Sequence, residues 1–230
     1  MASIKLGAIA SDIRGSIGGT VFSRNGGGAY AKCRTCPTNP NTAAQQIVRS
    51  IMSAMYAAWA ALTAGVKDGW NTYAKSVTLV NRLGDAINVS AYNMYARTKA
   101  VCELLGVAMP ATAPATMSLA EQDSTLAVAL DASDSDMDVT FDDSLGWANE
   151  VGGYMAVYQG RPVNPTVNSY DGPWKYAGKI SGAAEAPSSP ATIASQFTLN
   201  AGQKCFIKCR VLRADGRLST PFRCSGSVSA

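Results

Sequence analysis

The sequence predicts an α+β protein in several parts: an extended basic arm with a β-hairpin, a small bundle of three helices, and a β-sandwich. Three observations lead to this fold class. Residues 1–40 are rich in glycine, serine, arginine and proline, whereas residues 41–108 repeat apolar side chains at helical intervals. Residues 119–230 alternate apolar and polar side chains, and 230 residues suffice for two domains of about 100 residues.

The arm contains one strong strand pattern. Residues 20–23 and 29–32 flank the turn sequence Asn-Gly-Gly-Gly at residues 25–28, which predicts a hairpin. An isolated two-stranded hairpin is marginally stable in water, and ordering the backbone costs about 1–2 kcal/mol per residue. We therefore expect the arm to become ordered on a neighbouring chain. The residues expected to make this assembly contact are Arg14, Val21, Phe22, Arg24, Tyr30, Lys32 and Arg34.

The second part, residues 41–108, is predicted to contain three helices. Thr42, with a glutamine three residues later, forms the pattern of a capping box and marks the start of the first helix. The second and third helices are expected to begin after Thr63 and Ser90, and Gly106 is expected to end the third. Alanines in the first helix permit close contact, so we expect a small bundle.

Residues 109–118 are predicted to be a linker, because two prolines in a run of small residues favour an extended chain. Seven short candidate strands follow in residues 119–230, with turn signals between them, and this pattern predicts a β-sandwich. The candidate strands are residues 125–130, 137–141, 154–158, 174–180, 191–199, 204–212 and 222–228.

The last two candidate strands carry a resemblance to a known family. Two segments here resemble the end of a fibronectin type III domain. They are residues 199–211, Leu-Asn-Ala-Gly-Gln-Lys-Cys-Phe-Ile-Lys-Cys-Arg-Val, and residues 213–221, Arg-Ala-Asp-Gly-Arg-Leu-Ser-Thr-Pro. The resemblance implies an immunoglobulin-like sandwich that acts as a binding or spacer module. The family usually has a tyrosine where Cys205 stands here, so its tyrosine corner is missing.

The first half of the chain resembles a different group of proteins. Three segments are similar to segments of uncharacterised proteins from phage and prophage genomes. They are residues 19–25, Gly-Thr-Val-Phe-Ser-Arg-Asn, residues 39–46, Asn-Pro-Asn-Thr-Ala-Ala-Gln-Gln, and residues 81–85, Asn-Arg-Leu-Gly-Asp. This resemblance spans about residues 15–106 and implies a virion component. It implies no particular chemistry.

Catalytic and metal-binding patterns are weak. The chain has no histidine, which removes the commonest general base and the commonest zinc ligand. Cys33 and Cys36 have the spacing of half a zinc knuckle or of a redox pair, but no matching second pair follows. Asp134, Asp136 and Asp138 resemble the beginning of a calcium loop whose glycine and glutamate are absent. We expect no enzymatic activity, no cofactor and no metal.

The remaining cysteines suit a protein core. Cys205, Ile207, Cys209 and Val211 alternate along one strand and are predicted to face inward. A disulfide between Cys209 and Cys224 would cross the last hairpin if the register brought the two together, and the sequence does not determine that register.

Charge is distributed unevenly along the chain. Residues 1–110 contain 11 basic and 4 acidic residues, a balance of +7, whereas residues 111–230 contain 9 and 12, a balance of −3. The basic half therefore either has an acidic partner or is simply solvated. The arm's balance of +4 is small for a nucleic-acid-binding protein, so nucleic acid is not the partner we favour.

Three functional hypotheses follow. The first is a non-enzymatic structural protein of a bacteriophage virion, a capsid decoration or head or tail accessory protein made in the host cytoplasm. Its arm and helices would dock on other virion proteins in a multicopy assembly, and its sandwich would project. The second is a receptor-binding or carbohydrate-binding protein that uses sandwich loops such as residues 164–174. The third is a nucleic-acid-associated packaging protein. We expect no membrane partner, because the uncharged residues 50–66 are mostly small rather than strongly apolar.

Overall fold

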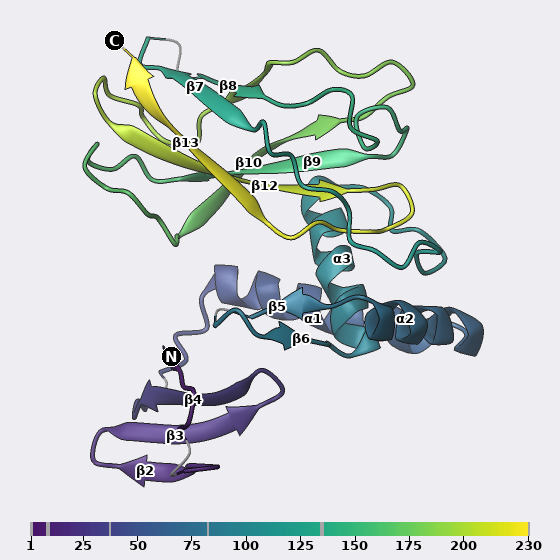
Figure 1. Ribbon diagram of the computed structural model, residues 1–230, viewed down its shortest axis with the longest axis vertical. Helices are drawn as coiled ribbons and strands as arrows, with labels where there is room; N and C mark the ends of the chain where they lie inside the picture. The colour runs from purple at the N-terminus through teal and green to yellow at the C-terminus, as the bar shows by residue number, and fades with distance from the viewer. Residues whose placement is uncertain (1, 8–9, 37, 82, 134–135, 230) are drawn as a thin grey trace.

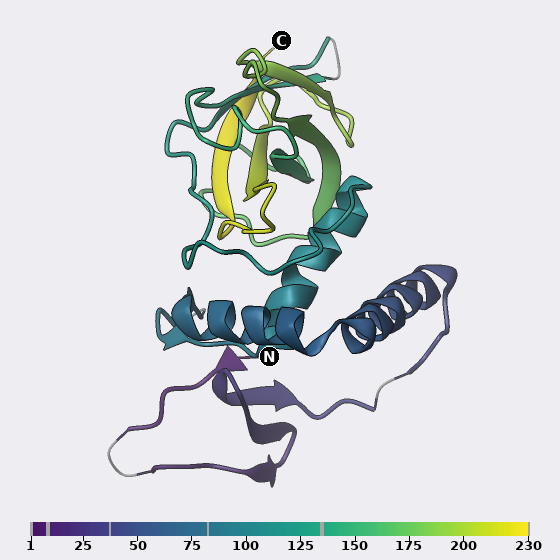
Figure 2. The same ribbon diagram turned by 90° about the vertical axis from the view of Figure 1, so that its right-hand side faces the viewer.

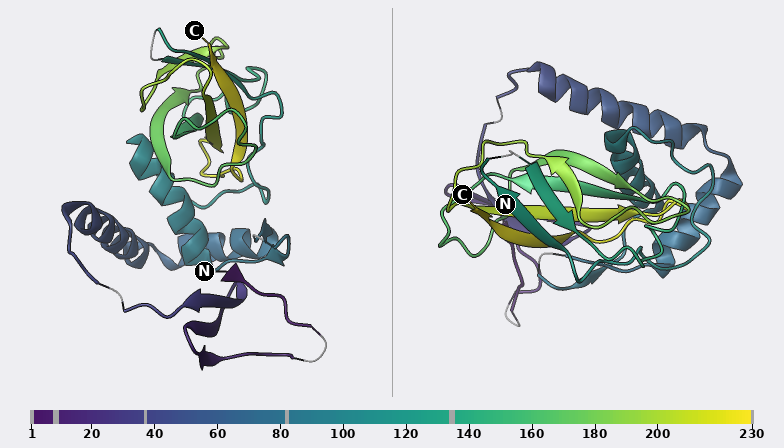
Figure 3. Two further views of the ribbon diagram at one scale, coloured as in Figure 1. Left: turned by 90° about the vertical axis from the view of Figure 1, so that its left-hand side faces the viewer. Right: turned by 90° about the horizontal axis from the view of Figure 1, so that it is seen from above.

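A computed structural model describes residues 2–7, 10–36, 38–81, 83–133 and 136–229. A small arm sheet lies at one end of the molecule, the helices lie in the middle, and a larger β domain lies at the other end (Figure 1). The left panel of Figure 3, turned by 90° about the vertical axis, shows the same order, with the helices between the arm sheet and the β domain.

The arm sheet is antiparallel and has the strand order β1-β4-β3-β2. The predicted hairpin is confirmed, because Asn25 pairs with Gly28 and leaves Gly26 and Gly27 as a two-residue turn. Two short strands, β1 and β2, were not predicted. None of the residues between 3 and 36 whose burial the structure describes is buried, so this sheet has no core of its own. Its strands are β1 Ala2–Ser3, β2 Gly15–Ile17, β3 Thr20–Asn25 and β4 Gly28–Cys33.

The three predicted helices are confirmed as α1 Ala43–Ala61, α2 Ala64–Ser76 and α3 Ala91–Leu105. Thr42 begins α1 with both halves of the capping box, since Thr42 and Gln45 each accept a hydrogen bond from the other's backbone N–H. Ser90 caps α3, and Gly106 ends it with a φ of 65°, a conformation that favours glycine. A short ribbon of β5 Leu79–Val80 and β6 Ala86–Ile87 joins α2 to α3.

The helices share one apolar core but do not form a closed bundle. Trp70 of α2 and Tyr95 of α3 meet edge to face with their ring centroids 5.6 Å apart, and both are buried. Trp59 and Leu62, at the end of α1, pack at the border of this core. Figure 2 shows α1 and α2 leading away from each other while α3 rises towards the β domain.

The β domain contains all seven predicted strands in the order β10-β9-β12-β13-β7-β8-β11. Every neighbouring pair is antiparallel except β13 and β7, which are parallel. The strands are β7 Ala127–Asp131, β8 Asp136–Thr140, β9 Tyr154–Gly160, β10 Trp174–Ser181, β11 Ala191–Ala194, β12 Lys204–Leu212 and β13 Phe222–Ser229.

The sheet curves until its two edge strands approach each other. A Cβ added to Gly178 of β10 would lie 3.0 Å from Cγ2 of Ile193 in β11. The domain is therefore a single, nearly barrel-like sheet around one core. β11 ends earlier than predicted, because the Ser195 hydroxyl donates to the Phe197 carbonyl and turns the chain.

The inner face of the sheet carries the core. Cys205, Ile207, Cys209 and Val211 are fully buried, which confirms the inward face predicted for β12. Gln159 is a buried polar residue of this core, and it donates to the Ser195 hydroxyl and accepts from the Gln196 backbone N–H, at 2.7 and 2.6 Å. Because its amide is hydrogen-bonded, its burial is tolerated.

The second half of α3 packs on the outer face of the β domain. Val101, Cys102 and Leu105 form a buried cluster with Leu212 and Leu218. Residues 109–118, which the sequence predicts to be a linker, lie along this junction, with Met109 packed against the clusters on both sides and Pro114 buried. The helices and the β domain are therefore joined by apolar packing as well as by the chain.

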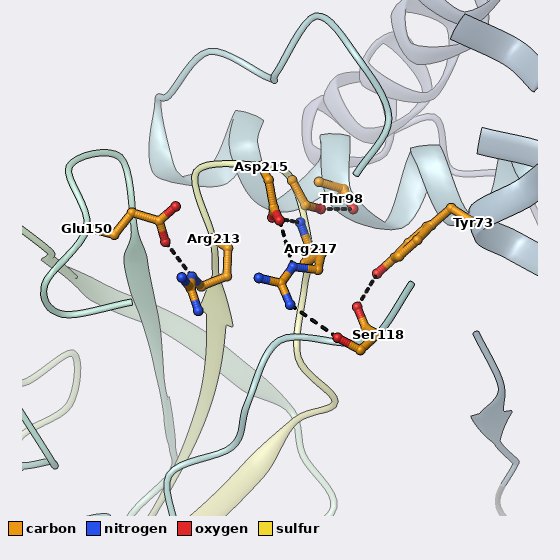
Figure 4. A network of polar contacts seen from close by, with 8 residues as sticks. Tyr73, Thr98, Ser118, Glu150, Arg213, Asp215 and Arg217 are labelled. Carbon is orange, nitrogen blue, oxygen red and sulfur yellow. Dashed lines mark hydrogen bonds and ion pairs between the residues drawn. The ribbon is translucent and has the colours of Figure 1, made fainter. Parts of the chain in front are cut away.

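Polar contacts complete the junction (Figure 4). The Thr98 hydroxyl donates to the Gly216 carbonyl at 3.1 Å. Arg97 donates to two carbonyls, those of Leu218 and Ser219, at 3.0 and 2.6 Å. Tyr73 of α2 donates to the Ser118 carbonyl at 3.2 Å. These bonds attach the loop between β12 and β13 to α3, and they attach Ser118 of the segment before the β domain to α2.

Candidate binding surfaces

The structure divides the predicted arm residues between two faces of the arm sheet. Val21 pairs with Lys32, and Tyr30 lies two residues away on the same face. Phe22 and Arg24 lie on the opposite face. One face thus carries an aromatic ring with a lysine, and the other carries a ring with an arginine, so neither face holds more than three of the seven expected residues.

The other two predicted arm residues lie at strand ends. Arg14 precedes β2 and donates to the Asp12 carboxylate at 2.7 Å. Arg34 follows β4, and its backbone N–H donates to the Gly19 carbonyl at 2.7 Å. Both side chains are exposed and available to a partner. The arm meets the rest of the chain in an exposed ion pair between Lys5 and Asp85, at 2.7 Å, which is a weak attachment in water.

A second surface lies on α1 and was missed by the sequence analysis, which expected this helix to pack within a small bundle. Val48, Met52 and Tyr56 follow one another at four-residue intervals and are 60, 50 and 65% exposed. Ile51 beside them is 39% exposed. The signal was present in the sequence, because this helix is apolar on more than one side.

A third surface is the outer face of β10, β9, β12 and β13, beside the part that α3 covers. Strand pairing places Lys208 next to Tyr158 of β9 and next to Arg223 of β13. The Lys208 ammonium lies 4.6 Å from the Tyr158 ring centroid and 4.9 Å from that of Trp174. The Arg223 guanidinium lies 5.3 Å from the Trp174 centroid. We call this surface, with Lys204 and Arg210, the cationic face.

The loop of residues 161–173 folds back over one end of the cationic face. Tyr170 stacks on Phe206 with centroids 5.7 Å apart and meets Trp174 edge to face at 5.0 Å. The ring passes directly over Gly160, where an added Cβ would lie 2.5 Å from the Tyr170 ring. The sequence pointed to the aromatics of this loop, but their partners on β9 and β12 depend on strand pairing.

The positive charge of this face is only partly neutralised. Burial lowers the pKa of Lys208, and the nearby charges of Arg210 and Arg223 lower it further. Burial also lowers the pKa of Arg210. In the part of the chain that the structure describes, the side chains of Lys208 and Arg210 have no hydrogen bond or ion pair. Asp171, 3.4 Å from Arg223, is the acidic group beside them.

A fourth surface is acidic and lies on the outer face of β7, β8 and β11. Asp131, Asp136 and Asp138 line an open hollow of about 280 Å³, together with Thr192 and Ser229. Asp134, from the predicted calcium-like pattern, lies outside the described residues. Among the residues described, no three acidic or cysteine side chains gather closely enough to hold a metal ion. We call this surface the acidic face.

All six cysteines are free thiols in the structure, including Cys209 and Cys224. The last hairpin pairs Cys209 with Phe222 and Cys224 with Ile207, so the two cysteines are offset and no disulfide joins them. Burial raises the pKa of Cys224 to about 12 and also raises that of Cys209, which keeps both thiols protonated. Cys33 and Cys36 are exposed.

Comparison with known proteins adds no assignment to these surfaces. Across the described residues, the helices are too short or too polar to cross a lipid bilayer. No known protein family, curated protein or solved structure matches this chain.

Proposed function

We propose that the chain is a non-enzymatic structural protein of a multicopy assembly, in which the arm and α1 dock on neighbouring subunits and the β domain projects. The observation that carries this proposal is that, among residues 3 to 36, none whose burial the structure describes is buried. Ordering such a segment costs more free energy than its own contacts return. A neighbouring subunit that pairs with the sheet edges and covers the exposed apolar side chains supplies the difference.

The α1 surface supports the same proposal. Val48, Met52 and Tyr56 expose apolar side chains on a helix whose only charged residue is Arg49. A contiguous exposed apolar stripe marks a site of protein contact. The resemblance of about residues 15–106 to phage proteins makes a bacteriophage virion the assembly that we propose, with the other virion proteins as partners.

We further propose that the β domain is an immunoglobulin-like sandwich of the fibronectin type III kind. The parallel contact between β13 and β7 covers only two residue pairs and divides the sheet into halves of four and three strands. Two antiparallel halves around one core are the arrangement expected of a seven-stranded sandwich. Such a domain suits a projecting spacer.

The two alternatives have less support. A carbohydrate-binding surface needs accessible aromatic platforms, and the rings of Tyr170 and Trp174 already contact Phe206, Lys208 and Arg223. A nucleic-acid-binding arm needs rings and cations together on one groove. The arm places its two aromatic rings on opposite faces of a small sheet.

The proposal is tested in particles purified from a host that carries the gene. Quantitative mass spectrometry should find many copies of the full chain per particle. A variant without residues 1–40 should remain folded by circular dichroism but be lost from the particles. Absence of the full chain from the particles, or normal incorporation without the arm, would contradict the proposal.

A matched pair of variants tests the contribution of α1. Replacing Met52 and Tyr56 with serine should reduce incorporation, because it removes apolar surface that a neighbouring subunit would cover. Val80→Ser together with Val151→Ser is the control, because these side chains are 66 and 73% exposed and lie outside α1. Equal incorporation of the two variants would show that α1 is not part of the docking surface.

A further inference from the structure

The β domain carries opposite charges on its two outer faces. Lys204, Lys208 and Arg210 alternate with buried residues along β12 and point away from the core. Asp136 and Asp138 alternate in the same way with buried Met137 and Val139 of β8. Because the inner residues of both strands belong to one core, the cationic and acidic faces point in opposite directions.

Neither face is balanced from within the described part of the chain. The hydrogen bonds of the acidic face come from neutral groups, because Asp138 accepts from the Thr192 hydroxyl and Asp131 from the hydroxyl and backbone N–H of Ser133. Lys208 and Arg210 likewise lack an ion pair there. Two patches of opposite net charge on one domain are a long-range source of attraction between copies.

The cationic face has the composition and order of a binding surface. Aromatic rings hold the side chains of Lys208, Arg223 and Lys204, whose charged groups lie 4.6 to 5.3 Å from a ring centroid. Side chains held in this way lose little entropy on binding. Tyrosine, tryptophan and arginine are also the residues that dominate binding energy at protein interfaces.

The acidic face has a complementary shape. Its hollow of about 280 Å³ is open to solvent and is lined by three carboxylates and by the Thr192 hydroxyl. A lysine or arginine head group fits a space of this size, where carboxylates accept charge-assisted hydrogen bonds.

We infer that the cationic face of one copy binds the acidic face of a second copy. The contact is head to tail, because each copy uses a different patch, and it leaves one free patch at each end of a pair. Copies can therefore add in a row or close into a ring. This contact goes beyond the docking proposed above, since it needs neither the arm nor any other virion protein.

Sedimentation velocity on the full chain tests the inference over a range of concentrations. The wild type should associate at about 50 mM salt and dissociate at about 500 mM, because salt screens exposed charges. Lys204→Glu with Lys208→Glu should weaken association about tenfold or more, and so should Asp136→Lys with Asp138→Lys. Lys67→Glu with Lys75→Glu, which makes the same charge change on α2 and outside both faces, should change it less than about twofold.

An equimolar mixture of the two reversed variants gives the decisive result. The lysine-to-glutamate variant carries acidic side chains on both faces, and the aspartate-to-lysine variant carries basic side chains on both faces. Each variant should therefore be monomeric alone. The mixture should associate, because the unchanged acidic face of the first variant can bind the unchanged cationic face of the second. Circular dichroism checks that each variant is folded, and Lys208→Gln and Asp136→Asn are the milder replacements if a double variant unfolds. A monomeric wild type at low salt, a mixture that stays monomeric, or equal weakening by the control pair would overturn the inference.

Discussion

At the scale of single residues, glycine and tyrosine together shape one end of the cationic face. Gly160 leaves space above β9 for the Tyr170 ring, and the Tyr170 hydroxyl donates to the Pro173 carbonyl at 2.8 Å and accepts from the Arg161 backbone N–H at 3.1 Å. Tyr170 therefore helps to hold the loop of residues 161–173 to the sheet, together with Arg223 of β13, which donates to the Tyr170 carbonyl at 3.0 Å.

Gly160→Ala should consequently destabilise the protein and displace this loop. The added methyl group would overlap the Tyr170 ring, and overpacking of this kind costs about 1–3 kcal/mol. Urea unfolding measures the change in free energy. Gly65→Ala in α2 is the control, because no atom lies within 4 Å of its added Cβ and alanine favours a helix. An unchanged midpoint for Gly160→Ala would show that the ring moves freely.

The thiols give a second residue-scale prediction. Only Cys33 and Cys36 should react rapidly with a thiol reagent in the folded protein, because they are exposed, while all six should react in denaturant. Reductant should leave the thermal midpoint of the protein unchanged, since no disulfide joins Cys209 to Cys224. A drop in the midpoint on reduction would reveal a disulfide that contributes to stability.

At the scale of elements, α3 has two roles because it packs on two partners. Its first turns bury Met94 and Tyr95 against α2, and its last turns bury Val101 and Leu105 against the β domain. Tyr95 and Leu105 are ten positions apart, which is about 15 Å along a helix. One helix thus crosses from the helical core to the outer face of the sheet.

The arm sheet is the part of the molecule that packing supports least. Backbone amides of β3 and β4 should exchange hydrogen rapidly in the isolated monomer and slowly in the assembly, because no described residue of the arm is buried. Amide exchange followed by mass spectrometry measures both states, and the amides of β12 serve as the protected reference. Strong protection of β3 and β4 in a proven monomer would mean that the arm needs no partner.

At the scale of the whole molecule, α3 makes the stability of the β domain depend on the helices. A fragment of residues 117–230 should fold, since its core is complete, but it exposes Leu212 and Leu218, which are buried under α3. Burial of one leucine side chain contributes about 1.5–3 kcal/mol, so the two together predict a loss of about 3–6 kcal/mol.

A longer fragment provides the control for this prediction. Residues 89–230 keep α3 and should recover much of the lost free energy of unfolding, measured by urea denaturation of both fragments. Equal stability of the two fragments would show that the junction with α3 contributes little.

The secondary structure was largely predictable because its signals are local. The caps at Thr42 and Ser90 and the alternation along β12 stand in short stretches of sequence, and the structure has helices and a strand at these places. The two-residue strands β1, β5 and β6 were not predictable, since so few residues carry no period and pair only where the fold brings them together.

The candidate surfaces were predictable only in part. The alternation of residues along β12 predicted that Lys208 and Arg210 face outward. It could not predict that Tyr158, Trp174 and Arg223 surround Lys208, because these residues come from three other strands. The arm residues were predicted as one set, and the pairing of Val21 with Lys32 divides them between two faces.

The sequence by itself determined the three-part order of the chain, its helices and longer strands, its core-facing cysteines and its lack of histidine. These properties follow from local spacing and from composition. The tertiary structure alone decided that α3 joins the helices to the β domain, that Tyr170 lies over Gly160, and that opposite charges occupy opposite faces. Each depends on contacts between residues far apart in the chain, and strand register and packing determine those contacts.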